Sequence, residues 1–117
     1  MANTFELIAS STVGAGGSTS VDFSSIPSTY TDLCLKFSVR TNRTSYDADN
    51  VNIRFNNDSG NNYSGRLLYG TGSAAGSASN SAETQIFWGY ASDANNTANT
   101  FGNGEWYIPN YAGSAYK

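Results

Sequence analysis

Histidine is absent from this sequence of 117 residues, and cysteine occurs only once, as Cys34. Without histidine, neither a Ser-His-Asp triad nor a Cys-His pair can form within the chain. The single cysteine cannot make an intrachain disulfide, and we interpret it as a small semi-apolar residue at a contact. The sequence also lacks a zinc-ligand cluster and a glycine-rich phosphate loop with its lysine. These absences predict that the protein is not an enzyme and holds no cofactor.

Basic residues are few, and long apolar runs are missing. The chain has 6 Lys and Arg against 9 Asp and Glu, a net charge of -3, and the basic residues are scattered. Nucleic-acid binding normally needs clustered Lys and Arg, so we expect no nucleic-acid partner. No window approaches the ~20 consecutive apolar residues of a membrane span. The N-terminus does not resemble a secretory signal either. We therefore expect no membrane partner.

The composition that remains is typical of a folded domain rich in turns. Hydrophobic residues make up 38% of the chain, aromatic residues 14% and charged residues only 13%. Disordered chains combine low hydrophobicity with high net charge, which is not the case here. Ser, Thr, Asn and Gly supply most of the polarity, and they suit turns between short strands. We expect one domain over residues 1–117, burying a little over ~60% of its unfolded surface.

Period-two alternation is the main structural signal. In residues 31–41, Leu33, Leu35, Phe37 and Val39 point to one face and the intervening residues to the other, as a half-buried antiparallel strand requires. Residues 70–82 are nearly all Gly, Ser, Ala and Thr, which predicts a flexible loop. Strands are predicted at 5–13, 18–24, 31–41, 51–56, 63–69, 84–91 and 104–109. The fold class is therefore all-β, an antiparallel β-sandwich that is jelly-roll-like.

Several motifs follow one another in an order that resembles a known family. They are FELIASSTVGAGG (5–17), SVDFSSIPSTYTDL (20–33), NYSGRLLYG (62–70) and GEWYIPNYAGS (104–114). Together they resemble a family of small β-rich virion structural proteins of tailed bacteriophages, of the tail-fibre and head-decoration type. The resemblance implies a structural role in the virion as a fibre or capsid decoration, with copies of itself and other virion proteins as partners. It also suggests a homotrimer, because viral appendages often have threefold axes.

The same resemblance implies a further strand after residue 117, so we expect a sandwich that is incomplete at its C-terminus. Two explanations stay open at this point. The sequence is the N-terminal part of a longer virion protein, or the missing strands come from another chain by addition to a sheet edge.

Aromatic residues are the candidate contact site. Phe87 and Trp88 are adjacent in a predicted strand and would point to opposite faces, so both faces need cover. Large aromatic side chains gain most from burial, and tyrosine suits adaptable recognition surfaces. The candidates for an interface or a ligand contact are Phe87, Trp88, Tyr90, Trp106 and Tyr107. Burial between subunits would favour the structural role. Exposure as a contiguous patch would favour the alternative, a receptor-binding module at a tail-fibre tip that recognises host surface glycans.

Acidic residues give two weaker candidates for a functional site, a calcium site and a catalytic carboxylate pair. Asp47, Asp49 and Asn50 lie close together, as a calcium ion would require, but the segment lacks the Gly and the distant Glu of an EF-hand loop. We interpret it as a solvated acidic loop, so no metal site is predicted. A carboxylate pair for glycoside hydrolysis could come from Asp93, Glu83 or Glu105, but nothing in their spacing selects a pair.

Overall fold

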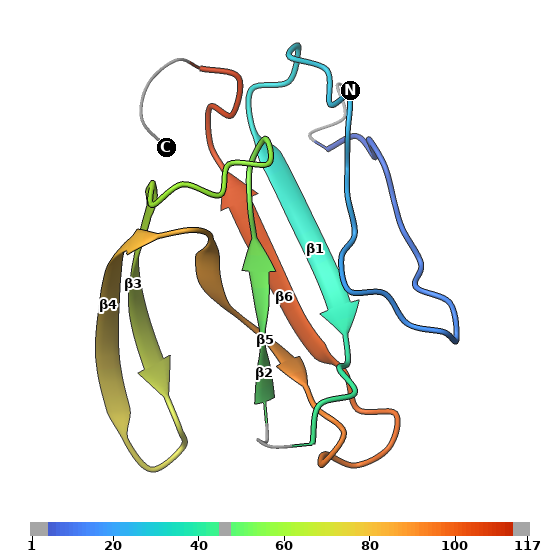
Figure 1. Cartoon of the computed structure of the whole chain (residues 1–117), viewed down its shortest axis with the longest axis vertical. Coiled ribbons are helices and arrows are strands. Elements are labelled where there is room, and N and C mark those ends of the chain that lie inside the picture. Colours follow the sequence, from blue (N-terminus) through green and yellow to red (C-terminus); the bar gives the residue numbers. More distant parts are fainter. Residues whose placement is uncertain (1–4, 45–47, 114–117) are drawn as a thin grey trace. The chain divides into compact units, whose positions relative to one another are not determined.

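Six β-strands make up the regular structure of the residues that the structure describes. The computed structural model describes residues 5–44 and 48–113, and within these ranges it contains strands and no helix (Figure 1). Accordingly, no helix in this part of the chain could cross a membrane. The strands are β1 (Leu33–Val39), β2 (Ala48–Ile53), β3 (Tyr63–Gly70), β4 (Ala75–Glu83), β5 (Ile86–Ser92) and β6 (Gly102–Ile108). The prediction of an all-β chain is confirmed.

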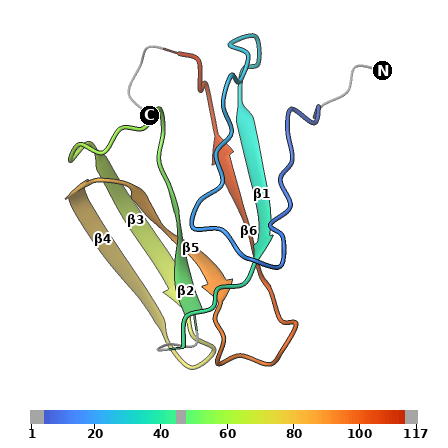
Figure 2. The same ribbon diagram turned by 45° about the vertical axis from the view of Figure 1, so that its right-hand side comes forward.

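The strands pair two by two, β1 with β6, β2 with β5, and β3 with β4. The β2–β5 pair is antiparallel, from Ala48 opposite Ser92 to Ile53 opposite Ile86. The β3–β4 pair is an antiparallel hairpin in which Gly70 lies opposite Ala75 (Figure 2). A turn closes this hairpin, with the Thr71 N–H donating to the Ala74 carbonyl at 2.9 Å. These antiparallel sheets are consistent with a β-sandwich.

Two compact units divide the chain. One comprises Met1–Leu33 and Tyr107–Lys117, and the other comprises Cys34–Trp106. In the first unit, the Tyr111 N–H donates to the Thr31 carbonyl at 3.1 Å, which joins its two segments. The second unit holds β2 to β5 with most of β1 and β6. A single domain over residues 1–117 stays a prediction.

Two predicted strands, 5–13 and 18–24, are not strands in the structure. The glycine turn between them does form, with Gly17 at φ +74° and its N–H donating to the Gly14 carbonyl at 3.0 Å. The flanking segments have the right alternation, but in the described residues they pair with no strand. A β-strand takes its hydrogen bonds from a neighbour, so alternation alone does not suffice to form one.

The prediction of a flexible loop at 70–82 was wrong for residues 75–82, which form most of β4. Ala, Ser and Gly have little preference for strands. Residues 75–82 form a strand because they pair with β3, and hydrogen bonds to a neighbouring strand stabilise a segment of low strand propensity. Tyr69 also places its ring over Gly76, its partner across the hairpin, where an added Cβ would lie 2.6 Å from the Tyr69 Cζ.

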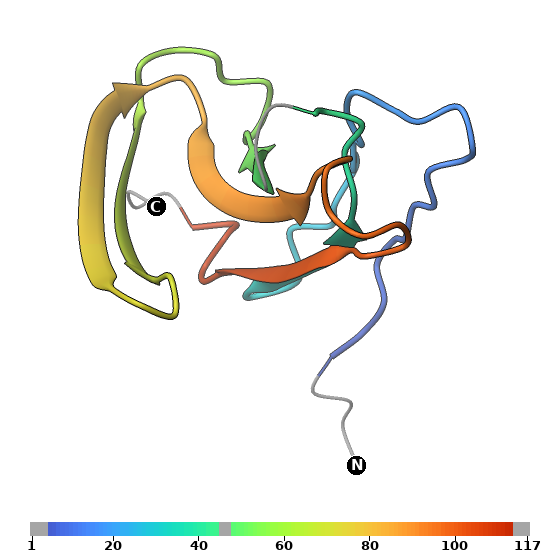
Figure 3. The ribbon, with the colours of Figure 1, turned by 90° about the horizontal axis from the view of Figure 1, so that it is seen from below.

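The β2–β5 pair and the β3–β4 pair each contain a bulge. Between Val51 and Ile53 the register of β2–β5 shifts, so that Phe87 and Trp88 lie opposite the single residue Asn52. Trp88 has φ +79°, in the left-handed region that a bulge normally assigns to glycine. The β3–β4 pair shifts between Tyr63 and Gly65, and Ala82 has φ +56° there. Figure 3 shows β5 as a bent ribbon, which a bulge explains.

Few residues are fully buried. Among the described residues only Gly89, Ala91 and Asp93 are buried, and all three belong to β5 or directly follow it. The larger side chains are half-buried or exposed. The core therefore lies along β5, and it is small for a chain with this aromatic content.

Candidate interface site

Trp106 in β6 packs on neighbouring strands of the second unit. Its ring lies 4.9 Å from the Phe37 ring, centroid to centroid, with 40° between the planes. That geometry is within the range of favourable aromatic pairs. Its ring also covers Gly89 of β5, where an added Cβ would be 2.7 Å from Trp106 Cζ2. Phe37 in turn lies over Gly104, so the two rings fill space that the two glycines leave open.

Trp88 makes the equivalent contact with the hairpin. An added Cβ on Gly65 would lie 2.7 Å from Trp88 Cζ3, so the indole lies against the β3 backbone. The bulge gives Trp88 this orientation, because it changes the alternation of β5. Phe87 and Trp88 are both half-buried. Trp88 and Trp106 thus hold strands of the same chain together.

Tyr90 and Tyr107 are the exposed members of the predicted site. Their side chains are 46% and 57% exposed. Tyr90 belongs to the second unit and Tyr107 to the first. The Tyr107 hydroxyl donates to the Asp32 carboxylate, which also accepts the Asn110 N–H at 2.7 Å. These two hydrogen bonds, that from Tyr107 foremost, lower the pKa of Asp32.

Further exposed apolar side chains lie outside the predicted site. Leu68 of β3 is 85% exposed, Leu7 is 80% exposed and Phe5 is 71% exposed. Sequence reasoning missed Leu68, although a signal was available. Leu67 and Leu68 are adjacent in a strand and must face opposite sides, so one of them needs cover from outside the hairpin. Elsewhere in the described part of the chain, the exposed large apolar residues include Ile8, Val13, Val21, Phe23, Tyr69 and Phe101.

A loop anchored by hydrogen bonds, residues 93–100, follows β5. The Arg40 guanidinium donates to the carbonyls of Asn96 at 2.8 Å, Thr97 at 3.0 Å and Thr100 at 3.0 Å. The buried Asp93 carboxylate accepts the Asn95 N–H at 2.9 Å, which fixes the start of the loop. Charge-assisted hydrogen bonds are among the strongest in proteins. The Arg40 contacts did not stand out in the sequence, because the carbonyls that accept from it lie 56, 57 and 60 positions away.

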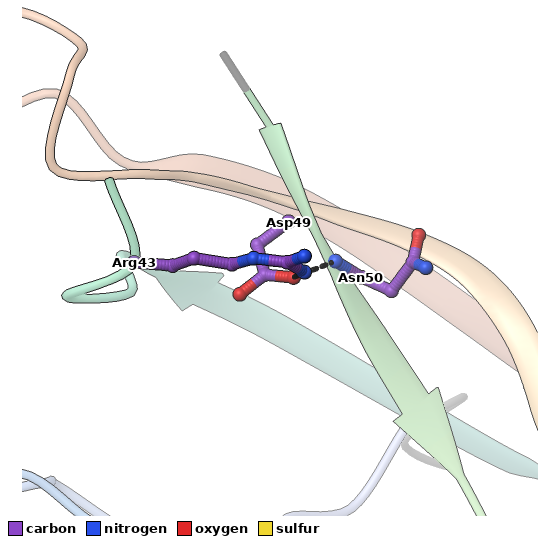
Figure 4. A network of polar contacts seen from close by, with 3 residues as sticks. All are labelled: Arg43, Asp49 and Asn50. Carbon is purple, nitrogen blue, oxygen red and sulfur yellow. Dashed lines mark hydrogen bonds and ion pairs between the residues drawn. The ribbon is translucent and has the colours of Figure 1, made fainter. Parts of the chain in front are cut away.

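The predicted acidic loop is only partly described, since Asp47 lies outside the described residues. Asp49 begins a small polar network in which its Oδ1 accepts from Arg43 Nη1 at 2.9 Å and from the Asn50 N–H at 2.9 Å (Figure 4). Burial raises the pKa of Asp49, but the hydrogen bonds from Arg43 and Asn50 outweigh it and the net pKa is lowered. Arg43 thus occupies an oxygen that a calcium ion would need.

Acidic residues are not gathered elsewhere. Among residues 5–44 and 48–113, no three His, Cys, Asp or Glu side chains form a group that could hold a metal ion. Glu105 pairs with Lys36 at 3.1 Å on an exposed surface, and Asp93 is committed to its loop.

Comparison of the chain with protein-family models, with curated proteins and with solved structures finds no match. The arguments on function therefore rest on the residues and on the geometry described above.

Proposed function

We propose that the chain is a structural protein of a tailed-bacteriophage virion, a surface-exposed fibre or capsid decoration that assembles through β-sandwich contacts. Its fold in the particle is a jelly-roll-like sandwich, and its assembly is a homotrimer seated on other virion proteins. The order of sequence motifs supports membership in such a particle. The antiparallel β-strands are compatible with it.

The exposure of large apolar side chains carries this proposal. Among residues 5–44 and 48–113, eleven such residues are exposed, including Leu68, Leu7 and Phe5. Burying a large apolar side chain contributes about 1.5–3 kcal/mol, so covering several of them would stabilise an assembly. Contacts with neighbouring subunits would supply that burial. A protein whose role is to assemble has a physical reason to expose them.

Purified virions provide the test. Particles are isolated by density gradient, the protein is sought by mass spectrometry, and its position is mapped with a gold-labelled antibody under the electron microscope. We expect the chain in every particle preparation, at a fixed ratio to the major capsid protein, and gold on the particle surface. Its absence from particles that contain the capsid protein would refute the proposal.

The exposed rings of Tyr90 and Tyr107 favour a second function, recognition of host surface glycans at a fibre tip. Exposed tyrosine rings can stack on sugar rings, and their hydroxyl oxygens can take part in hydrogen bonds with sugar hydroxyls. Binding of the purified protein to host cells would then be lost in Tyr90→Ala and retained in Ser59→Ala, a matched change in an exposed turn. Equal binding by both variants, or no binding by either, would exclude Tyr90 from such a site.

A further inference from the structure

Residues 5–13, here called the N-terminal arm, have the sequence of a strand without the pairing of one. Phe5, Leu7, Ala9, Ser11 and Val13 alternate with mostly polar residues. In the structure the whole arm is exposed, with Leu7 80% and Phe5 71% exposed. Its apolar side chains are open to water, and their burial against another surface would be favourable. Its backbone groups pair with no described strand and are available to join a sheet edge.

The β3–β4 hairpin has a free edge to which a further strand could be added. β4 pairs with β3 on one edge, and no strand of the described chain pairs with its other edge. Two-stranded hairpins are marginally stable alone and gain from a third strand. One face of the hairpin carries Leu68 beside Ser77 and Ser79, in a shallow depression that leaves the leucine exposed.

Three features of the arm fit this edge. The arm has nine residues and β4 has nine, so the two are equal in length at ~3.3 Å per residue. Residues 75–82 of β4 are Ala, Gly, Ser and Asn, whose small side chains leave room for large neighbours. These residues carry no charge, so Glu6 of the arm meets no like charge along them.

We propose that the N-terminal arm of one copy adds as a strand to the free edge of β4 in a second copy. The inference rests on the self-assembly in the proposed function and names the contact that produces it. Side chains of Phe5 and Leu7 would then lie over Ser77 and Ser79 and cover Leu68. Each copy gives one arm and receives one. Where it gives to one neighbour and receives from another, the contact is head-to-tail, and such contacts close into rings when the rotation allows. The addition also covers an edge that would otherwise promote uncontrolled aggregation.

Disulfide trapping between two distinguishable copies tests the proposal. Both carry Cys34→Ser, one carries Ala9→Cys, and the other, enlarged by a tag, carries Ser77→Cys, Ser79→Cys or Ser81→Cys. The three positions allow for the register of the added strand. The matched control partner carries Ser59→Cys in an exposed turn. Ala9 and the serines are small and exposed, so these changes leave the apolar contacts intact.

We expect one or more β4 cysteines to form the mixed disulfide about a hundredfold faster than the Ser59→Cys control, because docking holds the thiols at millimolar effective concentration. Equal rates at all four positions would overturn the proposal. So would rapid disulfide formation without a gain in mass in a single chain carrying both Ala9→Cys and Ser79→Cys, since the arm would then pair within its own copy.

Light scattering on the same samples separates this inference from the proposed function. Oligomers that form without preferential trapping would overturn strand addition and leave self-assembly standing. Preferential trapping by a chain that is absent from virions would support the arm contact and refute the virion role.

Discussion

Replacing Gly104 with alanine tests how this chain packs without large buried side chains. Gly104 lies in β6 under the Phe37 ring, and a Cβ there would lie 2.7 Å from Phe37 Cε1 and 2.9 Å from Cε2. Carbon atoms pack at about 3.5–4.0 Å, so the ring would have to retreat by about 1 Å. Trp106, 4.9 Å away between ring centroids, restricts that retreat.

Overpacking of this kind typically costs about 1–3 kcal/mol, so we expect Gly104→Ala to lower the free energy of unfolding by that amount. In urea this corresponds to a fall of roughly 1 M in the unfolding midpoint with an unchanged slope. Tryptophan fluorescence reports the transition, since Trp106 lies in the affected cluster. All variants are compared at one protein concentration, because self-association would change the midpoint.

The matched control is Gly16→Ala, where an added Cβ would meet no atom within 4 Å and φ is not positive. We expect that variant to keep the wild-type midpoint or to exceed it slightly. A second control places Phe37→Leu in the Gly104→Ala background, where the smaller side chain makes room for the new methyl group. The double variant should therefore lose less stability than the two single variants lose together. Equal midpoints for Gly104→Ala and Gly16→Ala would refute the packing of Phe37 on Gly104.

Three further predictions concern strain, pH and loop anchoring. Because Trp88 has φ +79°, Trp88→Gly should be about 1 kcal/mol more stable in urea than Trp88→Ala, and the opposite order would contradict the left-handed bulge. The hydrogen bond from Tyr107 lowers the pKa of Asp32, so the ionised carboxylate stabilises the folded state above about pH 4. This stabilisation is lost as the pH falls through the folded-state pKa. Asp32→Asn should therefore flatten the fall in urea midpoint between pH 5 and pH 2 (roughly the range over which a carboxylate titrates), and an unchanged acid sensitivity would exclude this pair as its source. Arg40→Lys keeps the charge but cannot reach three carbonyls at once, so amides 96–101 should exchange about tenfold faster by mass spectrometry while β3 stays protected, and unchanged exchange would show that Arg40 does not hold the loop.

Strands with a partner and a clear alternation were predictable from the sequence. The prediction at 31–41 contains β1, and those at 63–69 and 104–109 correspond to β3 and β6 within a few residues. In each of these, local preference and pairing agree. Alternation failed for the arm at 5–13, because a strand needs a neighbour and no strand among the described residues pairs with this segment. Propensity failed at 75–82, because β3 supplies hydrogen bonds that Ala, Ser and Gly do not predict.

The candidate site was predictable in its residues more than in its geometry. Aromatic content identified Trp88 and Trp106, but their contacts with Gly65 and Gly89 depend on the bulge and the strand register, which period-two patterns do not contain. Glycines in strands are a usable signal, since a strand glycine often marks close approach of another group. Leu68 could have been recognised from its neighbour Leu67. The Arg40 anchor required the fold itself.

We propose that other copies of the chain cover its exposed apolar side chains. Multi-angle light scattering of the purified protein over a range of concentrations tests it most directly. The account predicts a stable multiple of 12.4 kDa, with three copies expected. A folded monomer of 12.4 kDa at every concentration would contradict it.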